Sequence, residues 1–409
     1  MLPHRSLRPE QKQLLRLFLL CIPLILLGAA ILTSRNDLHH SDFFAFWLAG
    51  KMNWLQMDPY NPAQWTAGHD QFGATWKSND IFAYPLPLAL LLAPFGLLTI
   101  EQAYFIWITL AGLVLVGTVI VFLGVFLNSQ RKIHLIFPLL AAVTLFRPTL
   151  VTIYEGQLGA FLLLILSLAS ILLQRGRFWL SAVVLSCLML KPPIGAPILF
   201  LLVLWLIFQK NYKTVGILFA AGVGWLLVGL LQDRQWIPKF LTNGGEIFSN
   251  NAGLFSTTWG LSSRLCNEQA LCSVGLGALL TVLLLGISLW VLWSKKNLSA
   301  LNAVSLIISV SLVITPYIWP YDQILLIVPI LYLTMRLFQR GAPYLLVALF
   351  PMAMTLLSLG LLLLAIHLKQ DTWSVLLPLI CFGLSLAFPQ EHGTGLPEET
   401  GFEVQSNSI

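Results

Sequence analysis

The chain is poor in charge. Asp, Glu, Lys and Arg make up 10% of its 409 residues, hydrophobic residues make up 57%, and the mean hydropathy is +0.83. Typical soluble domains carry about a quarter charged residues. Apolar runs recur along nearly the whole length, so the composition excludes a soluble catalytic domain held by one anchor and predicts a single polytopic bundle of membrane helices.

Positive charge is scarce as well and occurs in short groups. The net charge of +6 comes largely from basic pairs between apolar runs, which is the arrangement that the positive-inside rule produces. This pattern argues against a nucleic-acid partner and predicts contact with membrane lipids. With both termini in the cytoplasm, every cytoplasmic connection carries a basic pair.

Cysteine is rare, with five residues in the chain. Cys21, Cys187 and Cys381 fall in apolar runs and are expected to be inert packing residues. Cys266 and Cys272 share one predicted outer loop, where a disulfide is plausible if that side faces an oxidising compartment. No cluster of His, Asp or Glu has clear metal-ligand spacing, so no metal and no other cofactor is predicted, although a divalent ion stays open.

The apolar runs predict an all-α protein with about twelve transmembrane helices in one domain, 1–388. The outer loops are 34–101 and 232–272, and the Gly-, Pro-, Glu- and Ser-containing tail, 389–409, is expected to be disordered in the cytoplasm. The run Tyr84–Leu98 is interrupted by three prolines and is expected to be a re-entrant or interfacial helix that does not cross the membrane. The predicted spans are roughly 13–33, 102–127, 133–147, 156–174, 178–190, 193–209, 214–231, 274–293, 301–316, 321–337, 343–364 and 372–388.

The polar interruptions of this pattern gather on one predicted face. Ionisable groups at the ends of spans are costly unless they are paired or hydrated, so their convergence predicts a water-filled cavity at the outer leaflet. The outer loops are also rich in aromatic residues, which stack on sugar faces or sit in the membrane interface. The residues concerned are Asp42, Asp58, Arg147, Glu155, Gln157, Lys191, Trp259, Arg264, Trp319, Tyr321 and Asp322.

Taken in order, these motifs resemble the polyprenyl-phosphate-sugar-dependent glycosyltransferases of family 87, which are related to the membrane mannosyltransferases of the C-type fold. The resemblance runs from about Ser41 to Pro329. One departure is Leu86, where the family commonly has a second proline. The matching elements are Ser41-Asp42-Phe43, Ala49-Gly50, Asp58-Pro59-Tyr60-Asn61-Pro62, Tyr84-Pro85, Leu90-Leu91-Leu92-Ala93-Pro94, Gly156-Gln157, Lys191-Pro192, Trp259-Gly260, Thr315-Pro316-Tyr317, Trp319, Tyr321 and Asp322.

The resemblance implies a C-type architecture with interfacial helices in a large first outer loop. It also implies transfer of a hexose, mannose above all, from a polyprenyl-phosphate donor to a hydroxyl of a lipid or glycan acceptor, with inversion. The expected location is the bacterial inner (plasma) membrane, with the active site facing the periplasm or the outside.

Asp42 is the expected catalytic residue. Transfer from a lipid-phosphate sugar needs one carboxylate to take the acceptor proton and no general acid, because the phosphate leaves already ionised. In the resembling family the matching acid is the proposed base. The alternative is that Asp42 caps a helix that starts at Phe43.

Lys191, Arg147 and Arg264 are the candidate cations for the donor phosphate, since charge that grows on the leaving phosphate must be offset. The alternative for the first two is snorkelling to lipid headgroups. The remaining candidates are expected to bind substrate. Turn formation is the alternative for Asp58, and helix capping is the alternative for Glu155 and Gln157. For Asp322 the alternatives are an ion pair with Lys191 and a simple helix-terminal charge. These substrate-binding candidates are Asp58, Tyr60, Tyr84, Glu155, Gln157, Trp259, Trp319, Tyr321 and Asp322.

A secondary transporter of a polar or anionic solute is the alternative function, with Lys191 or Asp42 as a coupling charge. Transporters usually have related halves and polar breaks near the bilayer midplane. The chain shows no internal repeat, and its polar groups cluster at one surface. A non-catalytic scaffold would leave these one-sided ionisable groups unexplained.

Overall fold

The computed structural model describes residues 28, 38–74, 82–126, 132–251, 254–295 and 298–388, and this part of the chain is all-helical. Most of the predicted first span, 13–33, and the predicted tail, 389–409, lie outside the described residues. The described elements are η1 (Leu38–His40), α2 (Asp42–Trp54), α3 (Pro62–Gln71), α4 (Leu86–Gly96), α5 (Ile100–Phe126), α6 (Lys132–Leu145), α7 (Arg147–Glu155), α8 (Gly159–Gln174), α9 (Phe178–Ser186), η2 (Cys187–Leu190), α10 (Pro192–Phe208), α11 (Tyr212–Gln232), α12 (Trp236–Asn251), α13 (Thr258–Leu265), α14 (Ala270–Ser294), α15 (Ala300–Ile314), η4 (Pro320–Leu326), α16 (Ile327–Gln339), α17 (Tyr344–Leu368), η5 (Thr372–Val375) and α18 (Leu376–Ala387).

Several of these helices are long and apolar enough to cross a bilayer. Five qualify on their own within the described residues, and a sixth forms if α6 and α7, which meet at 56°, are counted as one bent span. The eleven spans predicted after the first one each coincide with an apolar helix, but six apolar helices have only 10–17 residues. The chain is therefore an integral membrane protein, and the count of twelve crossings stays a prediction.

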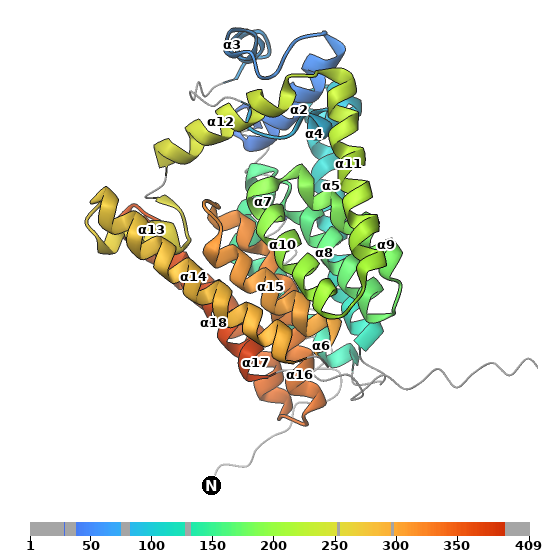
Figure 1. Cartoon of the computed structure of the whole chain (residues 1–409), viewed down its shortest axis with the longest axis vertical. Coiled ribbons are helices and arrows are strands. Elements are labelled where there is room, and N and C mark those ends of the chain that lie inside the picture. Colours follow the sequence, from blue (N-terminus) through green and yellow to red (C-terminus); the bar gives the residue numbers. More distant parts are fainter. Residues whose placement is uncertain are drawn as a thin grey trace, which may run out of the picture.

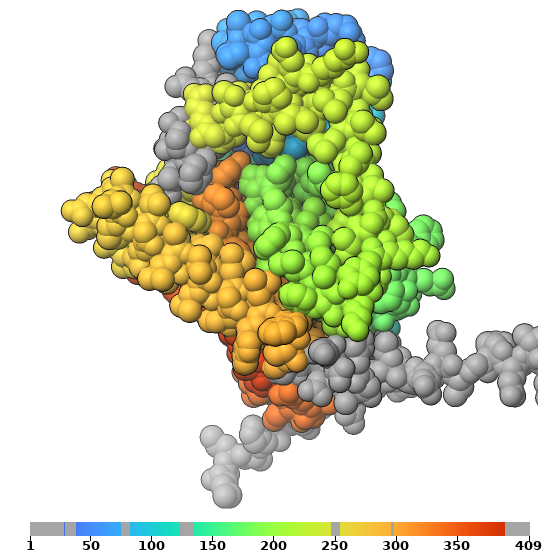
Figure 2. Space-filling model, in the orientation of Figure 1, coloured from blue at the N-terminus to red at the C-terminus, as the bar shows by residue number. Residues whose placement is uncertain are grey.

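The helices form a bundle that is closed at one end by a cap. Figure 1 shows α2, α3 and α4 together with α12 at this end, and α12 lies across the bundle instead of continuing along α11. Figure 2 shows that the same face is hollowed below α12, between α11 and α14. The two predicted outer loops thus meet at one end of the molecule, and the side of the membrane that this end faces stays a prediction.

Two glycines bring α2 and α4 into backbone contact. A Cβ atom on Gly50 would lie 2.4 Å from the carbonyl oxygen of Leu92, and one on Gly96 would lie 2.4 Å from the backbone nitrogen of Lys51. Such distances are too short for any larger residue. The Asn53 side chain adds a 2.8 Å hydrogen bond to the carbonyl of Ala89, so α2 and α4 form one close-packed pair.

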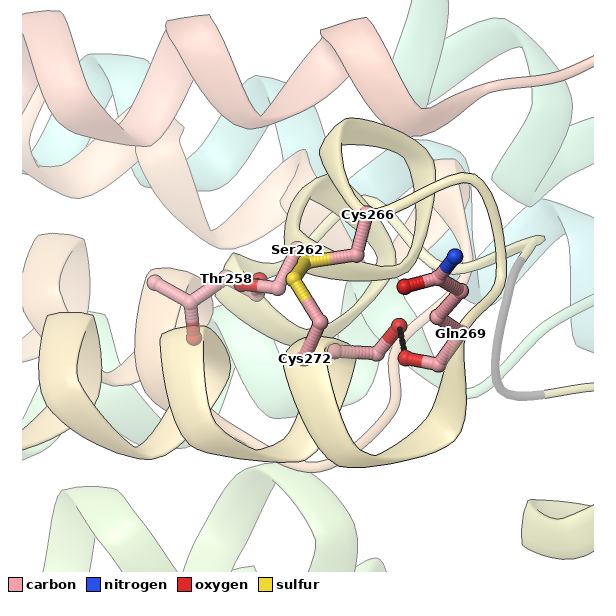
Figure 3. Close-up of a disulfide and its surroundings, with 6 residues drawn as sticks. Thr258, Ser262, Cys266, Gln269 and Cys272 are labelled. Atoms are coloured by element: carbon pink, nitrogen blue, oxygen red, sulfur yellow. Dashed lines mark hydrogen bonds between the residues drawn. A yellow bond between two sulfur atoms is a disulfide. The ribbon is translucent and has the colours of Figure 1, made fainter.

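The two cysteines of the predicted outer loop, for which the sequence left a disulfide open, are bonded to each other. Cys266 at the end of α13 is bonded to Cys272 in α14, with a Cα–Cα distance of 5.7 Å (Figure 3). The bond joins two helices that follow each other in the chain. Of the predicted packing cysteines, Cys381 is buried and Cys187 is partly buried, and both are free thiols.

Candidate active site

Four polar side chains from distant parts of the sequence form a continuous chain of hydrogen bonds. Gln157 Nε2 donates to Oδ2 of Asp42. Lys191 Nζ donates to Oε1 of Gln157 over 3.3 Å and to Oδ1 of Asp322 over 2.5 Å. The Gln157, Lys191 and Asp322 side chains are all buried, and Asp42 is half-buried at the edge of the chain.

Each member of this chain stands at the beginning of a helix. Asp42 is the first residue of α2, Gln157 lies two residues before α8, and Lys191 is the N-cap of α10. Asp322 lies in the first turn of η4, which continues into α16. Because helix N-termini carry partial positive charge and free backbone N–H groups, their convergence stabilises the two carboxylates and favours any anion that binds there.

Asp42 does not cap α2. Ser41 occupies the N-cap position, and α2 begins at Asp42, one residue earlier than the capping alternative required. The Asp42 carboxylate points instead toward Gln157. The capping alternative for Asp42 is therefore wrong, whereas its catalytic role stays a prediction.

A glycine places Gln157 beside Asp42. Gly156 ends α7 in the left-handed conformation, with φ of 66°, which favours glycine. A Cβ atom there would lie only 2.6 Å from the Cβ of Phe43, and the Gly156 carbonyl accepts a 2.8 Å hydrogen bond from Trp107 Nε1. The Gly156-Gln157 pair noted in the sequence thus has a physical basis, since only glycine permits this approach to α2.

Tyrosine rings surround the hydrogen-bonded chain. The Tyr84 ring packs edge-on against Phe46 at 5.0 Å, and the ring of Tyr321 lies 5.1 Å from Lys191 Nζ. Burial raises the pKa of Tyr84 well above its ordinary value of 10.0, and the negative charges of Asp42 and Asp322 raise it further. The phenol therefore stays protonated at neutral pH and can donate a hydrogen bond to a substrate oxygen.

The two acids of the chain differ in their surroundings. Asp322 is buried and forms an ion pair with Lys191, whereas Asp42 is half-buried. Lys191 carries three N–H donors, two of which have protein partners among the described residues. The third can donate to an anionic oxygen of a ligand.

The other two predicted phosphate-binding cations lie in different surroundings. Arg147 is buried and forms a bidentate ion pair with Asp371, in which two guanidinium nitrogens each lie 2.6 Å from a carboxylate oxygen. It also donates a hydrogen bond to Ser374. Arg264 is exposed and contacts Gln370 and Glu268. These contacts connect α7 and α13 to the segment around η5, and the structure does not bring either cation into the Asp42 hydrogen-bonded chain.

Asp58 and Tyr60 lie beyond the far end of α2. Asp58 accepts hydrogen bonds from the backbone N–H of Tyr60 and from Lys239 Nζ. The Tyr60 hydroxyl donates to the carbonyl of Tyr84 over 2.6 Å. Asp58 therefore shapes the turn, as the alternative predicted, and also forms an ion pair that the sequence did not indicate.

The remaining candidates have mainly packing contacts in the described structure. Trp259 donates from Nε1 to the carbonyl of Ile314 and packs against Gly277. Trp319 is the N-cap of η4 and lies 5.5 Å from the ring of Phe255. Glu155 is the last residue of α7, close to the hydrogen-bonded chain in sequence, and is half-buried.

Three charged residues, Asp233, Lys239 and Asp371, form ion pairs that the sequence analysis did not predict. Asp371 pairs with Arg147, and Asp233 pairs with Lys239 at 2.7 Å. Asp233 and Lys239 are six residues apart around the start of α12, so their pairing could have been predicted from the sequence. Asp371 is too far from Arg147 in the sequence for a local pattern to indicate their pairing. No group of three or more His, Cys, Asp or Glu side chains that could hold a metal occurs among the described residues.

The chain was compared with known proteins. No curated protein and no solved structure matches it significantly. The sequence profile described as glycosyltransferase family 87 matches residues 82–316, which is more than half of the chain. The matched region contains Gln157 and Lys191, whereas Asp42 and Asp322 lie on either side of it. The chain therefore belongs to glycosyltransferase family 87 and is a membrane glycosyltransferase.

Proposed function

We propose that this glycosyltransferase moves a hexose, mannose in the first place, from a polyprenyl-phosphate donor to a hydroxyl of a lipid or glycan acceptor, with inversion, and that Asp42 is the general base. The observation that carries the proposal is the hydrogen-bonded chain from Asp42 through Gln157 and Lys191 to Asp322. It combines a half-buried acid with a buried cation, and two of the three N–H donors of that cation have partners among the described residues.

In the proposed reaction, the acceptor hydroxyl lies against Asp42 while the hexose lies between this residue and the donor phosphate. The hydroxyl oxygen attacks the anomeric carbon from the face opposite the phosphate, and its proton passes to the Asp42 carboxylate. The bond between the anomeric carbon and the phosphate oxygen breaks, and the polyprenyl phosphate leaves with the electron pair. The configuration at the anomeric carbon is therefore inverted.

Charge growing on the departing phosphate is offset by the third N–H of Lys191 and by the converging helix N-termini. Preorganised donors of this kind stabilise a transition state because they need no reorganisation when the charge develops. Tyr84, protonated at neutral pH, is placed to donate to a sugar oxygen. No step of this mechanism needs a metal ion or another cofactor.

The hollow below α12 supports a membrane-bound donor (Figure 2). Its neighbours α11 and α14 bury only 22% and 6% of their apolar windows inside the protein, so most of their surface is available to lipid chains. A polyprenyl chain can lie along such a surface while its phosphate reaches the polar end of the bundle. We further propose that this end faces the periplasm or outside of a bacterial inner membrane, because the described basic residues of the turns 175–177 and 210–213 lie toward the other end of the bundle.

Purified protein in lipid nanodiscs tests the proposal. Radiolabelled polyprenyl-phosphate mannose is supplied with a membrane lipid and glycan extract, and polyprenyl-phosphate glucose and nucleotide-linked mannose are supplied in parallel. We expect label to move to a new product only from the polyprenyl-phosphate donors, with mannose preferred, and the anomeric configuration of the product to be opposite to that of the donor. Transfer from the nucleotide sugar alone, or retained configuration, would overturn the proposed donor or mechanism.

A further inference from the structure

A polar pocket lies at the other end of α2 from Asp42. It has a volume of about 250 Å³ and lies between the loop after α2 and the corner where α11 gives way to α12. Its lining residues are Asn53, Gln56, Met57, Asp58, Pro59, Leu86, Gln232, Asp233 and Lys239. Asn53 is eleven residues after Asp42, which corresponds to a rise of roughly 16 Å along α2.

One ammonium group organises the charges of this pocket. Lys239 Nζ lies 2.7 Å from Oδ2 of Asp58 and 2.7 Å from Oδ2 of Asp233. All three side chains are between a quarter and a third exposed, so they are fixed in position yet still hydrated. Water on such groups can be exchanged for the hydroxyls of a ligand without burying an unpaired charge.

The lining chemistry selects a neutral hydroxylated ligand. Two carboxylates and one ammonium leave a net negative charge, which disfavours phosphate and other anions. A divalent cation would have to displace Lys239 from both acids. Sugar and polyol hydroxyls both donate and accept, and they match the carboxylates, the ammonium and the carboxamides of Asn53, Gln56 and Gln232.

The size of the pocket and its apolar lining residues also favour a sugar or polyol ligand. Pockets that enclose drug-sized ligands have volumes of roughly 300–1,000 Å³, so this one fits a single ring or headgroup. Met57, Pro59 and Leu86 provide apolar contact for the C–H face of a sugar ring or cyclitol. A pocket of this composition has room for one unit of a larger molecule.

We propose that this pocket binds a sugar or polyol unit of the acceptor at a point remote from the hydroxyl that reacts at Asp42. This inference rests on the proposed function, because only an acceptor longer than one sugar unit reaches both places. The pocket is connected to the candidate active site through Tyr60, whose hydroxyl binds the carbonyl of Tyr84. The acceptor is thus a glycolipid or glycan with at least two hydroxylated units.

The first experiment measures binding without transfer. Thermal unfolding of the full-length protein is followed with millimolar methyl α-mannoside or myo-inositol, and separately with magnesium chloride or sodium phosphate at equal ionic strength. We expect one of the two hydroxylated probes to raise the melting temperature, and Asp233→Asn and Gln232→Ala to abolish or reduce this rise. Lys213→Gln, which removes an exposed charge at the other end of α11, is the matched control and should behave like the unmodified protein.

The second experiment measures transfer at varied acceptor concentration. For Asp233→Asn and Lys239→Gln we expect the acceptor KM to rise about tenfold, the loss of one hydrogen bond to a charged group, while the donor KM and the kcat at saturating acceptor stay within twofold. A purely structural ion pair would lower the melting temperature without this selective effect. Gln232 takes no part in the ion pairs, so Gln232→Ala keeps the test valid if the charge variants fail to fold.

The outcomes for the two proposals are distinguishable. If the unmodified protein transfers no sugar from any donor, the proposed function fails, and the binding experiment still decides whether the pocket holds a hydroxylated ligand. If transfer is normal but acceptor KM and the probe-induced rise are unchanged in all three variants, the pocket proposal is overturned. Stabilisation by phosphate or magnesium in place of the hydroxylated probes would also overturn it.

Discussion

The Nζ atom of Lys191 lies 2.5 Å from Oδ1 of Asp322, and both side chains are less than a tenth exposed. The other carboxylate oxygen of Asp322 accepts the backbone N–H of Trp319 at the start of η4. The pair therefore joins α10 to the break before α16, in addition to any contact with substrate. Removing one partner of a buried pair leaves an uncompensated charge and destabilises a protein by about 3–5 kcal/mol.

This pairing changes how a Lys191 variant must be interpreted. We expect Lys191→Met to lower the melting temperature sharply, and the double variant Lys191→Met/Asp322→Asn to recover most of the loss, because it leaves no lone buried charge and Asn still accepts the Trp319 N–H. Transfer should stay low in the double variant, since the cation near the donor phosphate contributes on the order of 2–4 kcal/mol to the transition state. Unfolding curves and turnover at low donor concentration measure the two effects. Near-normal turnover in the stable double variant would remove Lys191 from the mechanism.

Asp42→Asn should abolish transfer while leaving the fold and donor binding intact. Asn keeps the shape of the side chain but accepts no proton at neutral pH, and positioned general bases contribute ~10²–10⁴-fold. Turnover and donor affinity are measured on the same preparation, with Asp70→Asn, at an exposed acid of α3, as the matched control. A rate above about a tenth of the unmodified value, together with an inactive Asp58→Asn or Asp322→Asn, would show that another acid is the base.

Gln157→Leu should lower kcat by one to two orders of magnitude and change donor KM little. Gln157 donates to Asp42 and accepts from Lys191, so its loss leaves two polar groups each short of one partner, at a cost of about 1–3 kcal/mol per group. Gln157→Glu is the companion variant, since it keeps the shape and the contact with Lys191 but replaces the N–H donor to Asp42 with an oxygen. If both variants turn over normally, Gln157 does not position the base.

The sequence predicted which residues gather at the polar end but not which of them pair. Asp42, Gln157, Lys191 and Asp322 were all candidates because each interrupts an apolar run near a predicted helix end, and pairing of Lys191 with Asp322 was one option. The pairing of Arg147 with Asp371 depends on how α7 and η5 pack, and no local pattern encodes that packing. Arg147 and Lys191 therefore looked alike in the sequence although one is held in an ion pair outside the site.

The helix count was harder to predict than the helix positions. Each predicted span after the first coincides with a described apolar helix, but α7 falls between two predicted spans. In addition, α15 has 15 residues and α6 has 14, fewer than the ~20 needed to cross a bilayer in a straight line. Length and hydropathy alone therefore leave the number of crossings open. The bend of 56° between α6 and α7 also depends on packing, although Pro148 at the start of α7 marks its place.

Cysteine labelling tests the predicted topology. The disulfide Cys266–Cys272 is kept, and Cys21, Cys187 and Cys381 are replaced by Ala. A cysteine introduced at Gln56 should then react with an impermeant maleimide from outside intact cells, because it lies at the capped end. A cysteine at Arg175, in the turn after α8, should react only after the membrane is permeabilised. Labelling of the Arg175 position from outside would invert the orientation and the proposed location of the active site.

The Lys239 ion pairs should stabilise the protein over a defined pH range. The hydrogen bonds that Lys239 donates to Asp233 and then to Asp58 raise the pKa of Lys239 above 10.5. Burial acts to raise the pKa of Asp233, but hydrogen bonds from Lys239 and Gln235 outweigh it and lower the pKa below 3.8. Stability from Lys239 is thus present below pH 10.5 and lost as the pH rises through its folded pKa, and stability from Asp233 is present above pH 3.8 and lost as the pH falls through its folded pKa.

We therefore expect the melting-temperature difference between the unmodified protein and Lys239→Gln to be constant from about pH 5 to 9 and to shrink outside that range. The difference should be small, because partly exposed ion pairs contribute about 0–1 kcal/mol, and it should decrease further at high salt. Lys213→Gln should show no such profile. A difference that varied strongly between pH 6 and 8 would contradict the assignment of these charges.

The contact of Gly50 with Leu92 and of Gly96 with Lys51 determines how accurately the proposed base is aimed. Asp42 begins α2, and Tyr84 lies just before α4, so the spacing of these two side chains is fixed by backbone touching backbone and not by adjustable rotamers. Any larger residue at either glycine would push α2 away from α4 and tilt it. Asp42, at the opposite end of α2 from the contact, would be displaced most. Sequence changes some distance from the chemistry could in this way misalign the carboxylate while leaving every residue of the site unaltered.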